Sequence, residues 1–187
     1  SPRSSASSRS TGGARKLSEE EKAKIIQVEK AEVWVPIQGP QADAYFTTAK
    51  ETLFGGAAGG GKSALVLGIA RLEHRRSLVL RRTFPELERT MVSQSLEFYG
   101  DPKHYNAGKH VWAFPGSMGR EVHFGHLESD KAKHSYQGSQ YDGLFFDELT
   151  AFTLDQYLYL FSRARTTDPK QRVRILSTSN PGGEGND

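Results

Sequence analysis

Short apolar runs alternate along the chain with longer segments in which apolar residues recur every three or four positions. The short runs predict buried strands at residues 77–81, 143–147 and 173–177, because a strand covered on both faces is apolar throughout. The longer segments predict helices at residues 85–98 and 154–165. Strands that alternate with helices favour an α/β fold, with a mainly parallel sheet between helices on both faces.

Several segments lie outside this alternation. Residues 111–114 and 121–124 alternate apolar and polar positions on either side of a Pro-Gly-Ser turn, which predicts a β-hairpin. A capping-box pattern near the start predicts a helix over residues 19–30. Residues 33–36 end at a proline and are expected to be extended, and residues 41–49 are expected to form a short helix.

Composition narrows the classes of function. The chain has 187 residues and no cysteine, which suits one domain and excludes disulfides and thiolate metal sites. Residues 1–16 are rich in Ser, Gly and Arg and predict a disordered basic tail, which leaves residues 17–187 as the domain. The net charge is +3 and the tail alone carries +4, so the remainder carries −1 and its overall charge does not indicate nucleic-acid binding.

Residues 55–63, GGAAGGGKS, carry the clearest chemical signal in the chain. They contain the pattern G-x-x-x-x-G-K-[ST], in which backbone N–H groups hold a triphosphate and glycine allows the close approach. Residues 51–54 can form a strand before this loop, and residues 63–71 a helix whose positive end faces the phosphates. The residues expected to contact the phosphates are Gly56, Ala57, Ala58, Gly59, Gly60, Gly61, Lys62 and Ser63.

Asp147 and Glu148 end a second apolar strand. In nucleotide hydrolases the first acid of such a pair supports the Mg²⁺ shell, and the second orients the attacking water. The alternative is an acidic helix start with solvated carboxylates. The phosphate loop upstream favours the catalytic interpretation.

A polar cluster, STSNPGG, follows the last predicted strand at residues 177–183. Ligands bind at the carboxyl ends of strands in open α/β sheets, so Thr178 or Asn180 is expected to sense the γ-phosphate. The alternative is a Gly/Pro turn with local hydrogen bonds.

Four segments together resemble the ATPase domain of a tailed-phage terminase large subunit. They follow in order over about residues 36–185, and read GGAAGGGKS at 55–63, LRRTFPEL at 80–87, YQG and FDELT at 136–138 and 146–150, and TSNPGG at 178–183. The resemblance implies a three-layer P-loop NTPase of the additional-strand (ASCE) type. In that fold the strand at 173–177 lies between the phosphate-loop strand and the acidic strand.

The resemblance also implies a function, namely ATP hydrolysis that drives double-stranded DNA into a procapsid. The expected cofactors are ATP and Mg²⁺. The expected partners are double-stranded DNA, the portal protein, the terminase small subunit and further copies of the chain in a ring. The expected location is the host bacterial cytoplasm, transiently at the procapsid portal.

Individual roles carry over to matching residues. The resemblance makes Lys62 a phosphate contact that acts in catalysis, and Glu148 the catalytic carboxylate. Ser63 and Asp147 become the Mg²⁺ contacts. The segment 177–180, which includes Asn180, corresponds to a coupling segment that links hydrolysis to movement.

Two further roles have competing candidates. Gln41 is the expected adenine-reading glutamine, because its amide offers a donor and an acceptor to the base, and Gln38 is its rival. An arginine is expected to stabilise charge on the γ-phosphate. Arg82 is the first choice in cis; the other candidates are Arg81, and Arg163 and Arg165 for a neighbouring subunit's site.

The resemblance stops before a C-terminal nuclease, so DNA cleavage is not expected of residues 17–187, and the ATPase domain is expected to be incomplete at its C-terminal end. Two other functions remain open. One is a different P-loop DNA translocase or helicase-like ATPase. The other is a nucleotide-binding interaction module without hydrolysis.

Overall fold

The computed structural model describes residues 34–56, 59, 61–116 and 119–180. The predicted tail and first helix, at residues 1–16 and 19–30, lie outside the described residues. So do Ala57, Ala58 and Gly60 of the phosphate loop. Residues 34–37 have no regular secondary structure and lead into the first described helix.

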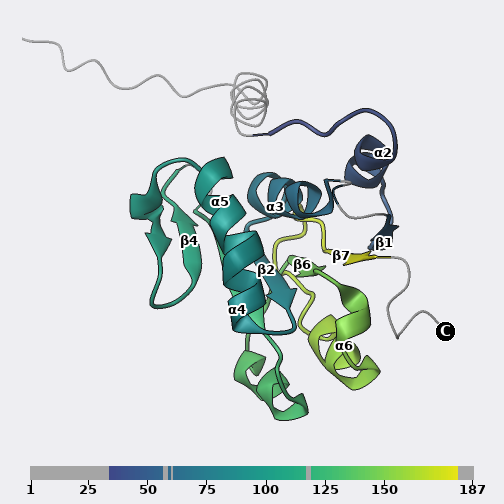
Figure 1. The fold of residues 1–187 in the computed structure, drawn as a ribbon, viewed down its shortest axis with the longest axis vertical. Helices are drawn as coiled ribbons and strands as arrows, with labels where there is room; N and C mark the ends of the chain where they lie inside the picture. Colours follow the sequence, from purple (N-terminus) through teal and green to yellow (C-terminus); the bar gives the residue numbers. More distant parts are fainter. Residues whose placement is uncertain (1–33, 57–58, 60, 117–118, 181–187) are drawn as a thin grey trace, which may run out of the picture.

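A sheet of seven strands forms the centre of the molecule (Figure 1). The order across the sheet is β1-β7-β6-β2-β5-β4-β3, and the first five of these strands are parallel. As the resemblance implied, β7 lies between the phosphate-loop strand β1 and the acidic strand β6. The strands are β1 (Glu51–Gly55), β2 (Arg76–Arg81), β3 (Tyr105–Asn106), β4 (Val111–Phe114), β5 (Arg120–His126), β6 (Gly143–Phe146) and β7 (Arg174–Ser179).

The predicted hairpin is confirmed, with β4 and β5 paired antiparallel from Val111–His123 to Phe114–Arg120. β5 also pairs in parallel with β2, from Arg76–Glu121 to Arg81–His126. The hairpin therefore extends the main sheet, and β3 adds a short antiparallel edge.

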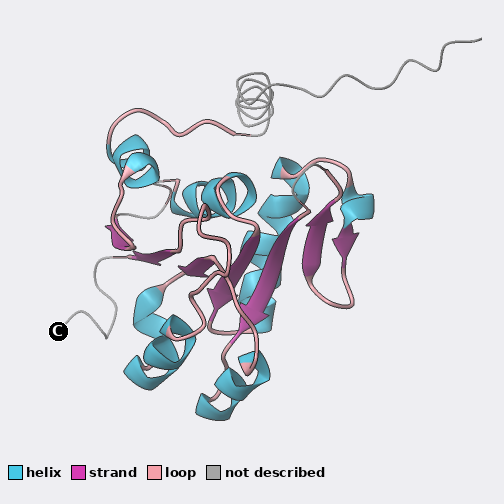
Figure 2. Cartoon of the chain, turned by 180° about the vertical axis from the view of Figure 1, so that it is seen from behind, coloured by secondary structure: helices cyan, strands magenta, loops and turns pink. Residues whose placement is uncertain are grey.

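Helices cover both faces of the sheet (Figure 2). One face carries α2 (Pro40–Phe46), α3 (Lys62–Leu72) and a helical segment made of α4 (Phe84–Leu87), a π-helical turn (Glu88–Val92) and α5 (Ser93–Phe98). The other face carries α6 (Leu154–Phe161) and the 3₁₀ helix Asp130–Tyr136. Shorter 3₁₀ helices span Pro102–His104 and Leu149–Ala151.

Two predicted helices end earlier than expected. The helix predicted to reach residue 165 stops at Phe161 because the chain after it pairs with Tyr141. Tyr141 donates its N–H to the Arg163 carbonyl at 3.0 Å and accepts from Arg165 at 2.9 Å. The helix predicted for residues 41–49 ends at Phe46, because Thr47 is extended.

Strand residues alternate between two apolar layers, as the pleat requires. Val79 of β2 packs with α3 and the segment 84–98, whereas its neighbours Leu78 and Leu80 pack on the side of α6. Phe145 and Phe146 of β6 divide in the same way. Both faces of the central strands are thus buried, which explains their continuous apolar runs. In the part of the chain that the structure describes, none of the helices has the length and apolar character that a membrane span requires.

Candidate nucleotide-binding site

A cavity of about 330 Å³ opens beyond the carboxyl ends of the parallel strands, next to the first turn of α3. This is where an open α/β sheet binds ligands. The phosphate loop, the acidic pair and the segment after β7 all contribute to it, although they lie far apart in the sequence. Its described lining residues are Gly59, Gly61, Lys62, Ser63, Ala64, Arg81, Thr90, Gln94, Asp147, Glu148 and Asn180.

The loop needs glycine at three described positions for backbone reasons. Gly56, Gly59 and Gly61 have φ angles of 149°, 83° and 72°, positive values that other residues rarely adopt. Gly61 is also crowded, because a Cβ there would lie 2.5 Å from Nε2 of Gln41. It is the N-cap of α3, so it sets where the helix and its exposed N–H groups begin.

Lys62 is buried, and its Nζ donates a hydrogen bond to the Gly56 carbonyl at 2.7 Å. The bond spans the loop from its last turn to its first. The lysine therefore lies along the inside of the loop, where a phosphate would be held. Ser63 follows it in the first turn of α3 and also lines the cavity.

Asp147 is only 3% exposed and is fixed by two neighbours. Its Oδ1 accepts a hydrogen bond from the Thr178 hydroxyl at 2.7 Å, and its Oδ2 lies 3.4 Å from Nε of Arg81. The contacts come from β7 and β2, the two strands that flank β6. The carboxylate is therefore held at the cavity by both neighbouring strands.

Glu148 has an unusual backbone, with φ of 60° and ψ of 66°. A non-glycine residue in this region costs roughly 1–3 kcal/mol and is most often found at functional sites. Its N–H donates to the Thr178 hydroxyl at 3.3 Å, and its side chain accepts a hydrogen bond from the Asn180 amide. The polar segment after β7 thus holds both acids, and the Asn180 Oδ1 is buried with no partner among the described residues.

Gln41, the expected adenine-reading residue, is not among the residues that line the cavity. It is 6% exposed, its Oε1 accepts from the Ile37 N–H at 2.6 Å, and its Nε2 donates to the Gly61 carbonyl at 3.0 Å. Both ends of the amide are used within the chain, so Gln41 joins α2 to the phosphate loop. The rival Gln38 is exposed and is also outside the lining.

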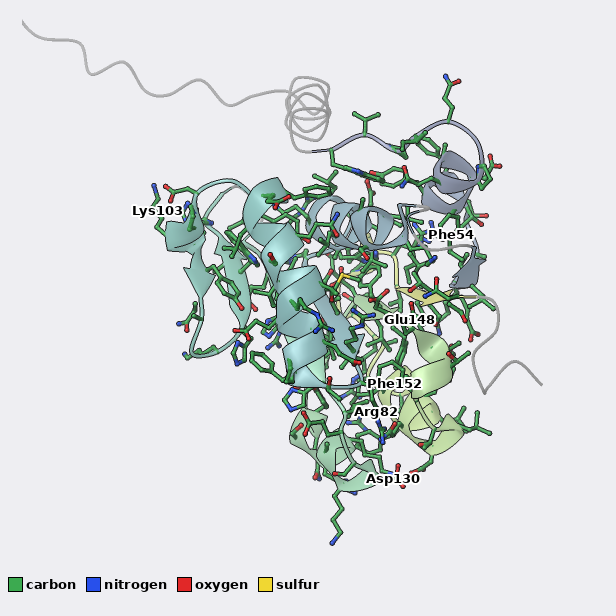
Figure 3. All side chains as sticks on the ribbon, viewed as in Figure 1. Phe54, Arg82, Lys103, Asp130, Glu148 and Phe152 are labelled. Carbon is green, nitrogen blue, oxygen red and sulfur yellow. The ribbon has the colours of Figure 1, made fainter. Side chains whose placement is uncertain are left out.

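The structure brings Arg81 to the cavity and leaves Arg82 away from it. Arg82 donates to Oε1 of Gln156 on α6 at 3.0 Å; Figure 3 labels it together with Glu148. The reason is the two-residue period of β2, which ends at Arg81. Arg81 shares the face of Val79 and meets the segment 84–98, whereas Arg82 turns towards α6.

Arg163 and Arg165, the candidates for a neighbour's site, are not part of this cavity either. The Arg163 guanidinium lies 5.1 Å from the centre of the Tyr159 ring. Arg165 lines a separate cavity with Arg75 and Asp142, at the opposite end of the strands.

Two lining residues, Thr90 and Gln94, have no counterpart in the sequence-based prediction. They lie four positions apart in the helical segment after β2, which places both on the cavity side. The sequence feature that could have indicated them is a pair of polar residues at helical spacing, soon after a predicted strand. Such pairs are common on any exposed helix face, so the feature is not specific.

Comparison with known families shows which family of proteins contains this site. The family described as "Terminase large subunit, T4likevirus-type, N-terminal" matches residues 53–184, which contain the phosphate loop, the acidic pair and the segment after β7. The chain belongs to the terminase large subunit family. No curated protein matches it.

Solved terminase structures have the same fold. A crystal structure of the large terminase from a thermophilic bacteriophage superimposes with a TM-score of 0.61 at 12% identity, over 79% of this terminase chain and 40% of that one. Two structures of the same phage protein in another crystal form, one in complex with ADP, give TM-scores of 0.51 at 14% and 15% identity. They cover 78% and 77% of this chain and 38% of theirs, so this terminase chain spans about two fifths of their length or less.

Proposed function

We propose that this chain is the ATPase motor domain of a terminase large subunit, which hydrolyses ATP to drive double-stranded DNA into a procapsid. The observation that carries the proposal is the meeting of Lys62, Ser63, Asp147 and Glu148, from segments some 85 positions apart, around one cavity. Membership of the terminase family and the ADP complex of the thermophilic phage protein support nucleotide as the ligand.

The residues present fit Mg²⁺ bound together with phosphates. Ser63 and the buried Asp147 line the cavity and offer the oxygen ligands that Mg²⁺ prefers. Among the described residues, no group of three or more His, Cys, Asp or Glu is placed to hold a metal ion by itself. When bound, Mg²⁺ would neutralise charge on the phosphate oxygens.

Glu148 is the residue that we assign to orienting the attacking water. The Asn180 amide donates a hydrogen bond to the Glu148 carboxylate and fixes it at the cavity. The left-handed backbone of Glu148 means that the chain does not continue as a strand at this residue.

Arg81 takes the role for which Arg82 was expected. A guanidinium has five N–H donors, and among the described residues Arg81 donates one to Thr90, while its Nε lies 3.4 Å from Asp147, so donors are left that can face a γ-phosphate in the cavity. Arg81 is 18% exposed, and this limited exposure strengthens its interaction with an anion.

The proposed partners follow from the family rather than from a described surface. They are double-stranded DNA, the portal protein, the small subunit and further copies in a ring, in the host bacterial cytoplasm. A contribution of Arg163 or Arg165 would be made in trans, to the cavity of a neighbouring copy, because neither residue lines the cavity of its own chain.

The test is Mg²⁺-dependent ATP hydrolysis by the full-length protein, compared with Glu148→Gln. The variant should bind a fluorescent ADP as tightly as the wild type, while turnover falls by roughly 10²–10⁴-fold. Glu97→Gln, an exposed acid on α5, is the matched control and should keep full activity. Equal hydrolysis by wild type and Glu148→Gln would overturn the proposal, and stimulation by single-stranded nucleic acid instead of capsid portal would favour a helicase-like motor.

A further inference from the structure

The helical segment 84–98 forms one wall of the nucleotide cavity. Thr90 and Gln94 line it together with the acidic pair, and Thr90 lies within a π-helical turn. In that turn the Ser93 N–H donates to the Glu88 carbonyl five positions earlier, rather than four as in an α-helix. Wide turns of this kind are frequent at functional sites.

The Thr90 hydroxyl is fixed in one orientation by two hydrogen bonds. It donates its proton to the Glu86 carbonyl at 2.7 Å, so its oxygen can only accept at the other side. Arg81 fills that place, with Nη1 donating to Oγ1 of Thr90 at 2.7 Å. The helix therefore presents an acceptor, not a donor, to the arginine.

Arg81 stands between two acceptors of unequal charge. Its Nη1 is held by the neutral Thr90, and its Nε lies 3.4 Å from the ionisable carboxylate of Asp147, which attracts a cation more strongly. Without the Thr90 oxygen, the Asp147 carboxylate would be the one side chain left to fix the guanidinium among the residues that the structure describes. Arg81 would then settle on Asp147, compete with Mg²⁺ for its oxygens and turn donors away from the γ-phosphate.

We propose that Thr90 is a positioning residue for ATP hydrolysis, which keeps the Arg81 guanidinium at the γ-phosphate position and away from full pairing with Asp147. Thr90 lies in the π-helical turn, and its bond to the Glu86 carbonyl fixes the hydroxyl in this place. The proposal rests on the proposed ATPase function and deepens it. Gln94, on the same side of the helix, shows that this face belongs to the cavity.

The experiment compares Thr90→Val, which keeps the shape but removes the hydroxyl, with Thr90→Ser, which keeps the hydroxyl. In the full-length protein Thr90→Val should lower kcat at least about tenfold, with KM for ATP within about threefold, because an interaction of the transition state is lost. Thr90→Ser should restore kcat. Ser93→Ala, an exposed neighbour in the same segment, is the control and should match the wild type.

A second readout does not depend on turnover. The Mg²⁺ concentration that half-saturates binding of fluorescent ADP should rise in Thr90→Val, because Arg81 then competes for Asp147. In Arg81→Ala that competition is absent, so adding Thr90→Val should change neither the Mg²⁺ requirement nor kcat further. If Thr90→Val does not fold, Thr90→Ala takes its place in both measurements.

The possible results separate the two proposals. A normal kcat and Mg²⁺ requirement in Thr90→Val, beside a strong loss in Arg81→Ala, would overturn the role of Thr90 and leave the ATPase proposal standing. A loss in Thr90→Val that Thr90→Ser does not restore would also overturn it. Absence of hydrolysis in the wild type would overturn the ATPase proposal and the role of Thr90 with it.

Discussion

The Thr178 hydroxyl donates a hydrogen bond to Oδ1 of Asp147 at 2.7 Å, and the same oxygen accepts the N–H of Glu148 at 3.3 Å. Thr178 is fully buried near the end of β7, and the two acids follow β6. One side chain therefore fixes the carboxylate of the first acid and the backbone of the second. A shift of β7 along β6 would move both acids together.

We expect Thr178→Val to weaken the site more than the fold. The substitution keeps the volume but leaves Asp147 and the Glu148 N–H each short of a buried partner, which costs about 1–3 kcal/mol. The Mg²⁺ concentration needed for half-maximal ATP hydrolysis should rise, and kcat should fall. Thr178→Ser retains the hydroxyl and should behave nearly as the wild type; a loss of equal size in Thr178→Ser would contradict the assigned role.

We expect substitutions of the two consecutive arginines, Arg81 and Arg82, to have different effects on kcat. Arg81→Ala removes a cation from the cavity, and an arginine that stabilises phosphoryl transfer is worth roughly 10³–10⁵-fold in kcat. Arg82→Ala removes a hydrogen bond to Gln156 outside the cavity, so it should cost about 1 kcal/mol of stability and leave kcat unchanged. Steady-state kinetics and thermal unfolding of both variants check this, and a larger kinetic loss in Arg82→Ala would restore the sequence-based assignment.

Gly61→Ala should destabilise the phosphate loop for two reasons. The residue has φ of 72°, and the added methyl would meet Nε2 of Gln41 at 2.5 Å, which breaks the bond between α2 and the loop. Such backbone strain costs roughly 1–3 kcal/mol. In a domain of this size each kcal/mol lowers Tm by about 2–4 °C.

Gly55→Ala is the matched control for stability, because the space around its Cβ position is open. A thermal scan should show Gly55→Ala close to the wild type and Gly61→Ala several degrees lower. Equal Tm values for the two variants would show that the crowding at Gly61 relaxes without cost.

Asp142 should make the fold sensitive to acid. Burial raises the pKa of this carboxyl, but the His74 ring and the N–H groups of Arg75 and Arg76 outweigh burial and hold the pKa below its ordinary value. A depressed pKa stabilises the folded state above the unfolded pKa of about 3.9, and this stability is lost as pH falls through the folded value.

Denaturant unfolding at pH 7 and over the range below about pH 4 tests this. Asp142→Asn should lower stability at pH 7 by about 1–3 kcal/mol and flatten the acid-side slope, because it replaces an ionised acceptor of two backbone bonds. Glu97→Gln, at an exposed carboxylate of α5, should change neither quantity measurably. If Asp142→Asn keeps the acid-side slope of the wild type, the acid sensitivity of the fold comes from other groups.

The sequence predicted the parts of the site whose chemistry is local. The phosphate loop follows from residues 55–63 alone, and the acidic pair from a strand that ends in two carboxylates. The central strands were also predictable, because burial on both faces leaves an apolar run. The place of β7 between β1 and β6 came from the resemblance, since periodicity carries no information on strand order.

The rest depended on contacts between distant segments. Arg81 and Arg82 are identical in type and adjacent, and only the phase of β2 against its neighbours decides which one meets the cavity. Gln41 has the right chemistry for a base, but its neighbours Ile37 and Gly61 use both ends of its amide. Thr90 was missed because the periodicity of residues 85–98 predicts one regular helix, without a wide turn.

That wide turn also sets the rotational phase of everything after it. Each helical residue advances the side chains by about 100°, so one additional residue in a turn shifts the following face by nearly a third of a revolution. Ser95, which accepts the Trp112 indole N–H at 2.9 Å, lies beyond the turn, and Thr90 lies within it. Deleting a single residue between them would convert the wide turn into an α-helical one, but only one of these two hydroxyls could then keep its partner.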